Sequence, residues 1–119
     1  RDYYASRGLG DVYKRQDHNG LQIDGTIDEV NSAMPLADKF RAFKWHVIEL
    51  ADGNDMAQIA AAFAEARKVS DSPVAIIAET VKGKGVSFME NQVGWHGKAP
   101  NDEQFEQAMA ELAAAGEEL

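Results

Sequence analysis

The stretch from residue 17 to residue 28 holds the side chains whose types and spacing best suit chemistry. It reads Asp-His-Asn-Gly-Leu-Gln-Ile-Asp-Gly-Thr-Ile-Asp. Asn19 offers an amide oxygen, Gly20 allows a tight turn, and Leu21 and Ile23 form a pair that looks buried. Because Mg²⁺ takes few oxygen ligands from protein and the rest from phosphates and water, the stretch predicts a loop for a metal–diphosphate pair. The alternative is that Asn19 is only a hairpin turn residue, since Asn-Gly favours such turns.

His96 is the second candidate, between Trp95 and Gly97. Glycine lets a ligand approach the backbone closely, and an imidazole beside a diphosphate can donate a hydrogen bond. The alternative is a loop histidine stacked on Trp95. His46 alternates with apolar residues and is predicted to be structural, and His18 is predicted to be a bystander beside the turn.

Lys82-Gly83-Lys84-Gly85 could cradle a phosphate through free amides and two cations. It could equally be a solvated turn after a buried strand, and this interpretation is slightly favoured. The sequence contains no recognisable Ser-His-Asp or paired-carboxylate arrangement.

The elements that must position these residues follow from periodicity. The pattern predicts helices over 36–44, 56–69 and from 101 onward, and strands over 46–50 and 74–78. Alternating strands and helices indicate an α/β fold, a partial parallel sheet flanked by helices. Ligands bind such sheets beyond the carboxyl ends of the strands. The Asn19 loop and a long glycine-bearing loop over 81–100 both follow strands, so we expect them to share one rim.

The composition narrows the classes of partner. The 119 residues include 20 Asp or Glu and 12 Lys or Arg, for a net charge of −8. An acidic chain is repelled by nucleic acid and by anionic membranes, so neither is expected as a partner. Cysteine is absent, and we see no apolar run of membrane-spanning length and no signal peptide. A cytoplasmic location is therefore expected.

Residues 1–16 differ from the remainder. They carry four Lys or Arg and two Asp, so they are basic. Residues 17–119 carry eight Lys or Arg and eighteen Asp or Glu, so they are acidic. The stretch from Ser6 to Gln16 resembles a translated sequencing-adapter tail, and the alternative is a disordered native arm. We therefore expect residues 1–16 to be a non-native or disordered leader, and residues 17–119 to be the domain. If the leader is an artefact, an upstream part of the protein is missing.

Five segments in order resemble transketolases: residues 17–25, 45–48, 52–53, 80–90 and 94–100, the last reading Gly-Trp-His-Gly-Lys-Ala-Pro. The resemblance covers essentially all of 17–119 and is strongest to the N-terminal subunit of two-chain transketolases. It implies the C-terminal half of a thiamine-diphosphate-binding domain. It also implies transfer of a two-carbon ketol unit between phosphosugars, as in the pentose phosphate pathway.

The resemblance also implies roles for individual residues. Asn19 would bind the divalent metal, Mg²⁺ or Ca²⁺, and contact the diphosphate. Leu21 would give its backbone carbonyl to the metal. His96 would lie over the cofactor, touching its diphosphate and the donor sugar, which makes it the candidate catalytic residue. The implied partners are a C-terminal subunit with the pyrimidine-binding domain, and a second copy of this chain.

The sequence departs from the family pattern in several places. The upstream Gly-Asp-Gly motif, whose aspartate is another metal ligand, is absent, as are upstream cofactor and substrate histidines. Lys44 and Asn54 replace a usual glycine and histidine in peripheral turns. We therefore expect this polypeptide alone to be inactive. Two alternatives are a 1-deoxyxylulose-5-phosphate synthase-like enzyme, which shares Lys-Gly-Lys-Gly, and a non-catalytic acidic α/β interaction module.

Overall fold

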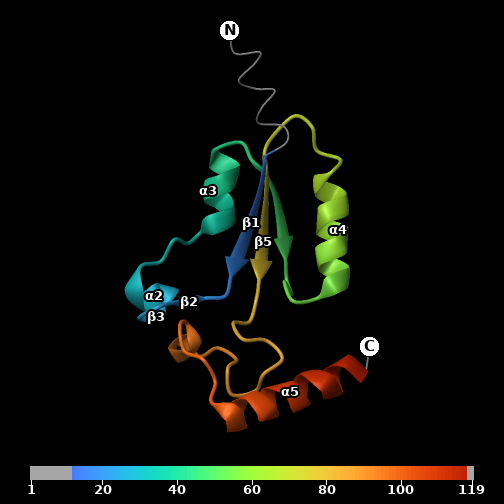
Figure 1. Cartoon of the computed structure of the whole chain (residues 1–119). Coiled ribbons are helices and arrows are strands. Elements are labelled where there is room, and N and C mark those ends of the chain that lie inside the picture. The colour runs from blue at the N-terminus through green and yellow to red at the C-terminus, as the bar shows by residue number, and fades with distance from the viewer. Residues whose placement is uncertain (1–11, 118–119) are drawn as a thin grey trace. The chain divides into compact units, whose positions relative to one another are not determined.

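The strand β5 (Val74–Glu79) is the centre of a three-stranded parallel sheet in the computed structural model, which describes residues 12–117. Its neighbours are β1 (Tyr13–His18) and β4 (His46–Leu50), and both begin in register with Val74 (Figure 1). The run from Val74 to Ile77 is buried, as an apolar strand paired on both edges and covered on both faces requires.

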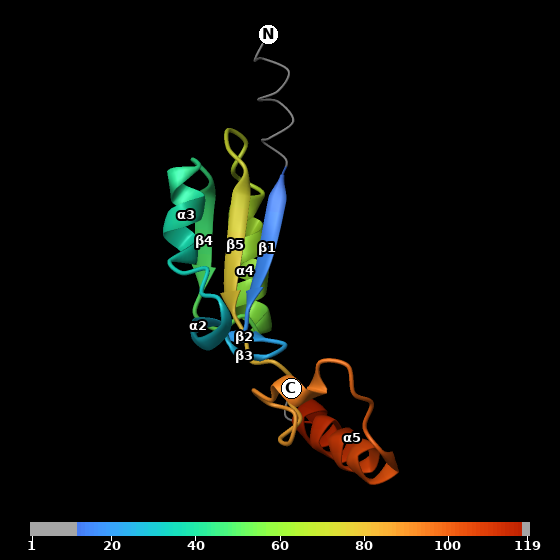
Figure 2. The same ribbon diagram turned by 90° about the vertical axis from the view of Figure 1, so that its left-hand side faces the viewer.

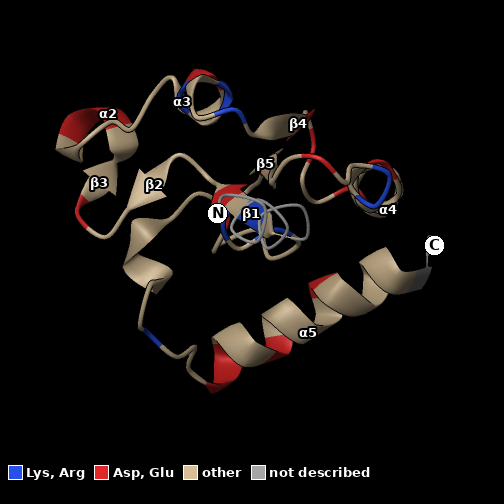
Figure 3. Ribbon diagram, turned by 90° about the horizontal axis from the view of Figure 1, so that it is seen from above, with Lys and Arg blue, Asp and Glu red and all other residues tan. Residues whose placement is uncertain are grey.

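Two helices cover opposite faces of this sheet, α3 (Leu36–Ala42) and α4 (Met56–Ala66) (Figures 2 and 3). The core cluster lies between α4 and the sheet and contains Ile48, Leu50, Ala62, Ala66, Val74 and Ile76. Asp55 begins α4 by accepting the N–H of Ala57 at 2.7 Å through its carboxylate. This is an N-cap, which satisfies a helix-end donor that has no partner within the helix.

The predicted α/β class, a parallel sheet flanked by helices, is confirmed. The strand predicted over 46–50 has these bounds, and β5 extends one residue beyond its predicted end. The helices predicted over 36–44 and 56–69 end earlier, at residues 42 and 66. The inward positions of α4 are taken by Ile59, Ala62 and Phe63, and Met56 at its start is 73% exposed.

The first strand crosses the boundary that the sequence analysis drew at residue 17. Residues 13–16 belong to β1, and the N–H of Val74 donates to the carbonyl of Val12 at 2.9 Å. The strand is polar, reading Tyr-Lys-Arg-Gln-Asp-His, and it pairs through its backbone with the apolar β5. Residue 17 is therefore not a structural boundary. Residues 1–11 lie outside the described residues, and the non-native origin of 1–16 stays a prediction.

The chain divides into two compact units. The strands β1, β4 and β5 with α3 and α4 form the sheet unit, made of the described residues 12–18 and 32–80. Residues 19–31 and 81 onward form the second unit, which we call the loop unit. It contains the antiparallel hairpin of β2 (Leu21–Gln22) and β3 (Gly25–Thr26), then α2 (Ile27–Val30), the 3-10 turn η1 (Val93–Trp95) and α5 (Asp102–Glu117). Within residues 12–117, no helix is long and apolar enough to cross a membrane.

Candidate functional site

Asn19 starts the hairpin of the loop unit and shapes its turn. Its side-chain oxygen accepts the N–H of Leu21 at 3.0 Å. Gly20 takes a positive φ of 70°, which favours glycine, and its carbonyl accepts the N–H of Ile27 at 2.9 Å. Because these bonds hold the turn from both sides, the sequence Asn-Gly-Leu places one amide oxygen and the Leu21 backbone at the hairpin's entrance.

The loop from 81 to 100 is tied to itself by hydrogen bonds. The carbonyl of Lys82 accepts the N–H of Asn91 at 2.9 Å, which closes the first half of the loop. The indole N–H of Trp95 donates to the carbonyl of Phe88 at 3.0 Å, and the two rings pack at 5.3 Å between centroids. His96 ends η1, with its N–H donating to Val93 at 3.0 Å.

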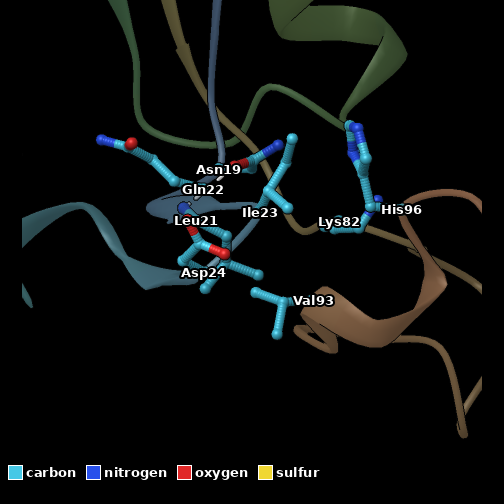
Figure 4. Close-up of a pocket in the computed structure, with 8 residues that line it drawn as sticks. All are labelled: Asn19, Leu21, Gln22, Ile23, Asp24, Lys82, Val93 and His96. Carbon is cyan, nitrogen blue, oxygen red and sulfur yellow. Dashed lines mark hydrogen bonds between the residues drawn. The ribbon is translucent and has the colours of Figure 1, made fainter. Parts of the chain in front are cut away.

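The hairpin and the loop border an open pocket of about 450 Å³ within the loop unit. Its lining combines amide, acidic, basic and imidazole groups with apolar side chains (Figure 4). The lining residues are Asn19, Leu21, Gln22, Ile23, Asp24, Lys82, Val93 and His96. The structure thus brings together Asn19, Leu21 and His96, the residues to which the family resemblance gives metal, cofactor and catalytic roles. Their roles stay predictions.

Ile23 differs from its expected place. The sequence suggested that Leu21 and Ile23 were both buried, but Leu21 is half-buried and Ile23 is 65% exposed. The hairpin turns between β2 and β3 directly after Gln22, so Ile23 stands at its tip rather than under it. In the view of Figure 4 its side chain lies between Asn19 and His96. Ile23 therefore gives the pocket an apolar surface.

Lys82 and Lys84, which the sequence analysis treated alike, have different environments. Lys82 lines the pocket, whereas the ammonium of Lys84 lies 3.5 Å from a carboxylate oxygen of Glu90. Gly83 separates them with a φ of 73°, and a Cβ there would lie 2.7 Å from the carbonyl oxygen of Met89. Lys82 is thus the pocket residue that sequence reasoning undervalued. The sequence feature that could have indicated this is the position of Lys82 directly before Gly83, which forms the turn.

The other two histidines lie in the sheet unit, outside this pocket. A ring nitrogen of His18 lies 2.6 Å from Glu79, and one of His46 lies 3.1 Å from Glu65. Both imidazoles therefore contact carboxylates of neighbouring elements. The indole of Trp95, which the alternative interpretation stacked on His96, has the ammonium of Lys98 over its ring at 4.8 Å from the centroid.

The donor set suits a hard cation shared with a diphosphate. One lone pair of the Asn19 amide oxygen accepts the Leu21 N–H, and a carbonyl oxygen has a second one for a metal. Among residues 12–117 no group of three or more His, Cys, Asp or Glu could hold a metal by itself. An amide oxygen and a backbone carbonyl fit Mg²⁺ only when phosphate and water complete its shell. The residues present therefore fit a metal–diphosphate pair rather than an all-protein metal cage.

Comparison with protein families gives one match over nearly the whole chain. Residues 2–118 match the family model described as transketolase, thiamine diphosphate binding domain. The matched range includes most of the stretch that the sequence analysis set apart.

Two relatives illustrate the match. The chain is 37% identical over 114 residues to the 6-deoxy-6-sulfo-D-fructose transketolase subunit SqwG of a Clostridium species, covering 96% of this chain and 41% of that protein. It is 40% identical over 122 residues to an apulose-4-phosphate transketolase subunit from Phocaeicola vulgatus, covering 98% and 43%. The chain therefore spans about two fifths of the length of these relatives.

Solved structures agree in fold. A crystal structure of a transketolase mutant from Pichia stipitis superposes with a TM-score of 0.79 at 26% identity, covering 91% of this chain and 16% of that one. Transketolase from Campylobacter jejuni superposes with a TM-score of 0.80 at 25% identity, covering 93% and 18%.

Proposed function

The chain belongs to the transketolase family, within its thiamine-diphosphate-binding domain, and we propose that the protein transfers a two-carbon ketol unit between phosphosugars. The observation that carries the proposal is the pocket of the loop unit. It collects Asn19, Leu21, Lys82 and His96, from two segments far apart in the chain. Amide, carbonyl, ammonium and imidazole groups are what a metal-bound diphosphate needs from a protein.

Each of these residues has a proposed task. Asn19 and the carbonyl of Leu21 bind Mg²⁺ or Ca²⁺, and Asn19 also contacts the diphosphate. Lys82 offsets phosphate charge in a chain whose net charge is −8. His96 donates a hydrogen bond to the diphosphate and orients hydroxyl groups of the donor sugar. When bound, thiamine diphosphate supplies the carbon nucleophile that cleaves the ketose and carries the two-carbon unit.

The proposed partners follow from the family. The two relatives described above are named as subunits of transketolases. We propose a second polypeptide, the C-terminal subunit with the pyrimidine-binding domain, and a second copy of this chain. The named sugars of the two relatives carry a sulfonate or a phosphate, which supports an anionic sugar as substrate here.

Titration of the chain with thiamine diphosphate and Mg²⁺, followed by NMR and calorimetry, tests the cofactor site. We expect weak binding, with shifts at the amides of residues 19–24, Lys82 and His96. Asn19→Ala should weaken binding by about tenfold or more, a loss usual when groups that fix a bound metal are removed. Asn31→Ala is the matched control, because the described contacts of Asn31 in the loop unit are made by its backbone N–H and carbonyl.

The two lysines give a sharper pair of variants. Lys82→Ala should weaken binding of Mg²⁺–thiamine diphosphate by about tenfold, since a hydrogen bond to a charged group is worth roughly 1.5–3 kcal/mol. Lys84→Ala should leave it nearly unchanged, because that ammonium already faces Glu90. Equal losses for the two variants would count against this pocket. A non-catalytic interaction module would instead show no heat and no shifts with thiamine diphosphate even when a Gly-Asp-Gly segment is supplied upstream of residue 17.

A further inference from the structure

A carboxylate of α5 is hydrogen-bonded to the middle of the pocket-lining loop from 81 to 100. The side chain of Glu111 accepts two hydrogen bonds from Ser87, one from the backbone N–H at 2.6 Å and one from the hydroxyl at 2.7 Å. Each oxygen of the carboxylate takes one of these donors, so the pair is fixed in both distance and direction. Ser87 lies between Lys82 and His96 in sequence, and both of those residues line the pocket.

The carboxylate is itself held in place. The amide N–H of Gln107, four residues earlier on the same helix, donates to one oxygen of Glu111 at 2.8 Å. Residues four apart lie on the same face of a helix, so Gln107 steadies the rotamer of Glu111. These bonds lower the pKa of Glu111, with the Ser87 hydroxyl as the largest cause and the Ser87 N–H next. The carboxylate is therefore ionised, and both Ser87 donors have a charged acceptor.

Close packing surrounds this polar contact. Val86 and Ala108 are each only 8% exposed and are the buried residues of the loop unit among those described. A Cβ on Gly85 would lie 3.2 Å from a methyl carbon of Leu112. The turn at 85–87 is thus seated against α5 by burial as well as by the carboxylate.

Two hydrogen bonds connect the region around Ser87 to the segments of the loop that carry Lys82 and His96. On one side, the turn is closed by the bond from the Asn91 N–H to the Lys82 carbonyl. On the other, the Phe88 carbonyl next to Ser87 accepts the indole N–H of Trp95, the neighbour of His96. A displacement of Ser87 would therefore strain the turn that the Lys82 carbonyl closes and the Trp95–Phe88 hydrogen bond beside His96.

We propose that Glu111 is a positioning residue of the diphosphate pocket: by clamping Ser87 to α5, it holds Lys82 and His96 toward Asn19. The inference rests on the proposed function for its ligand, but the positioning itself is a property of the ligand-free chain. It also gives α5, whose residues do not line the pocket, a place in ligand binding.

The test uses the full chain and four variants. Glu111→Gln replaces one acceptor oxygen with a donor, and Ser87→Ala removes the hydroxyl. Ser87→Thr keeps the hydroxyl and serves as the rescue. Glu103→Gln removes a charge from the same acidic helix without touching Ser87 and is the matched control. Backbone order parameters of residues 82–97 are measured without ligand, and the affinity for Mg²⁺–pyrophosphate is then measured by NMR titration.

In Glu111→Gln and Ser87→Ala we expect lower order at Lys82 and His96 and about tenfold weaker Mg²⁺–pyrophosphate binding, the loss of one hydrogen bond to a charged acceptor. The affinities of Ser87→Thr and Glu103→Gln for Mg²⁺–pyrophosphate should stay within about twofold of that of the unchanged chain. This change is smaller than the loss expected for one such hydrogen bond. Unchanged resonances of β4 and β5 confirm that the sheet unit folds in every variant. If Glu111→Gln unfolds the loop unit, the comparison of Ser87→Ala with Ser87→Thr tests the positioning role, through the order of Lys82 and His96 and the affinity for Mg²⁺–pyrophosphate.

Two results separate the inference from the proposed function. If Lys82 and His96 are as ordered in Glu111→Gln and Ser87→Ala as in the unchanged chain, the positioning role is wrong, whatever the ligand does. If order falls as expected but the unchanged chain does not respond to Mg²⁺–pyrophosphate, the positioning role stands and the proposed ligand is wrong.

Discussion

The sheet unit and the loop unit are held together by different forces. The sheet unit buries a continuous apolar cluster around Ile48, Val74 and Ile76. The buried residues described in the loop unit are Val86 and Ala108, and its shape depends instead on turns, positive-φ glycines and charged hydrogen bonds. The candidate site lies in the second kind of structure, within the loop unit.

This difference shows where binding residues are found. A buried cluster tolerates little polarity, so it cannot offer amide, ammonium and imidazole groups to a ligand. Loops can offer them, but they bury too little apolar surface to be rigid without specific ties. In this chain the Asn19 turn, the Asn91–Lys82 bond and the Ser87–Glu111 clamp supply those ties.

A matched pair of isoleucine substitutions gives the largest expected contrast between the units. Ile76 is 5% exposed in the core of the sheet unit, and Ile23 is 65% exposed at the hairpin tip. Ile76→Ala should lower the free energy of unfolding by about 2–5 kcal/mol, because it removes buried surface and leaves a cavity. Ile23→Ala should change it by less than about 0.5 kcal/mol.

Urea unfolding followed by circular dichroism measures both values. Equal losses of unfolding free energy for the two variants would mean that Ile23 is buried in solution. The contrast between a unit held by an apolar core and a unit held by specific hydrogen bonds would then be wrong. Because Ile23 lines the pocket, its variant is also expected to weaken ligand binding while leaving stability intact.

The sequence predicted the sheet unit best where apolar periodicity was strong. The strands predicted over 46–50 and 74–78 follow directly from residue types, and the structure adds only Glu79 to the second. The strand β1 was not predicted over 13–16, because Lys14, Arg15 and Gln16 carry no apolar alternation and gain their place by backbone pairing with β5. Such pairing is a tertiary effect that a local pattern does not contain.

The loop unit was predictable through motifs rather than periodicity. Asn19, Leu21 and His96 were selected from residue chemistry and from resemblance to a family, and the structure gathers them around one pocket. The exposure of Ile23, the turn η1 and the separate environments of Lys82 and Lys84 were not predictable. They depend on the exact path of a glycine-bearing loop, which a single-sequence pattern does not specify.

Gly83 should give an intermediate effect, confined to the loop unit. Its φ of 73° and the 2.7 Å approach of a Cβ to the Met89 carbonyl oxygen make Gly83→Ala strained in two ways. We expect local destabilisation of about 1–3 kcal/mol, seen as faster amide hydrogen exchange over 82–91 with β5 unaffected. Gly94→Ala, where a Cβ would meet open space, is the control and should change exchange by less than about 0.5 kcal/mol. Faster exchange in β5 of Gly83→Ala would show that the two units unfold together.

The smallest expected effect is a pH dependence in each unit. Hydrogen bonds from the Ala57 N–H and from Gln58 lower the pKa of Asp55 from its ordinary 3.8, and those from Ser87 lower that of Glu111 from 4.5. A carboxylate whose pKa is lower in the folded state stabilises it fully above the unfolded value, and this contribution is lost as the pH falls through the folded value. Asp55→Asn keeps a good capping residue, so it should resemble the unchanged chain at neutral pH and lose less stability in acid, measured by thermal unfolding of the sheet unit.

Glu111→Gln should instead flatten the acid dependence of exchange at the Ser87 amide in the loop unit. Each substitution is expected to alter the acid response of its own unit alone, because the hydrogen bonds that lower each pKa come from within that unit. If Asp55→Asn also changed the acid response at Ser87, the stability of the site's loops would depend on the helix cap of the sheet unit. The sheet unit and the loop unit would then unfold as one cooperative unit.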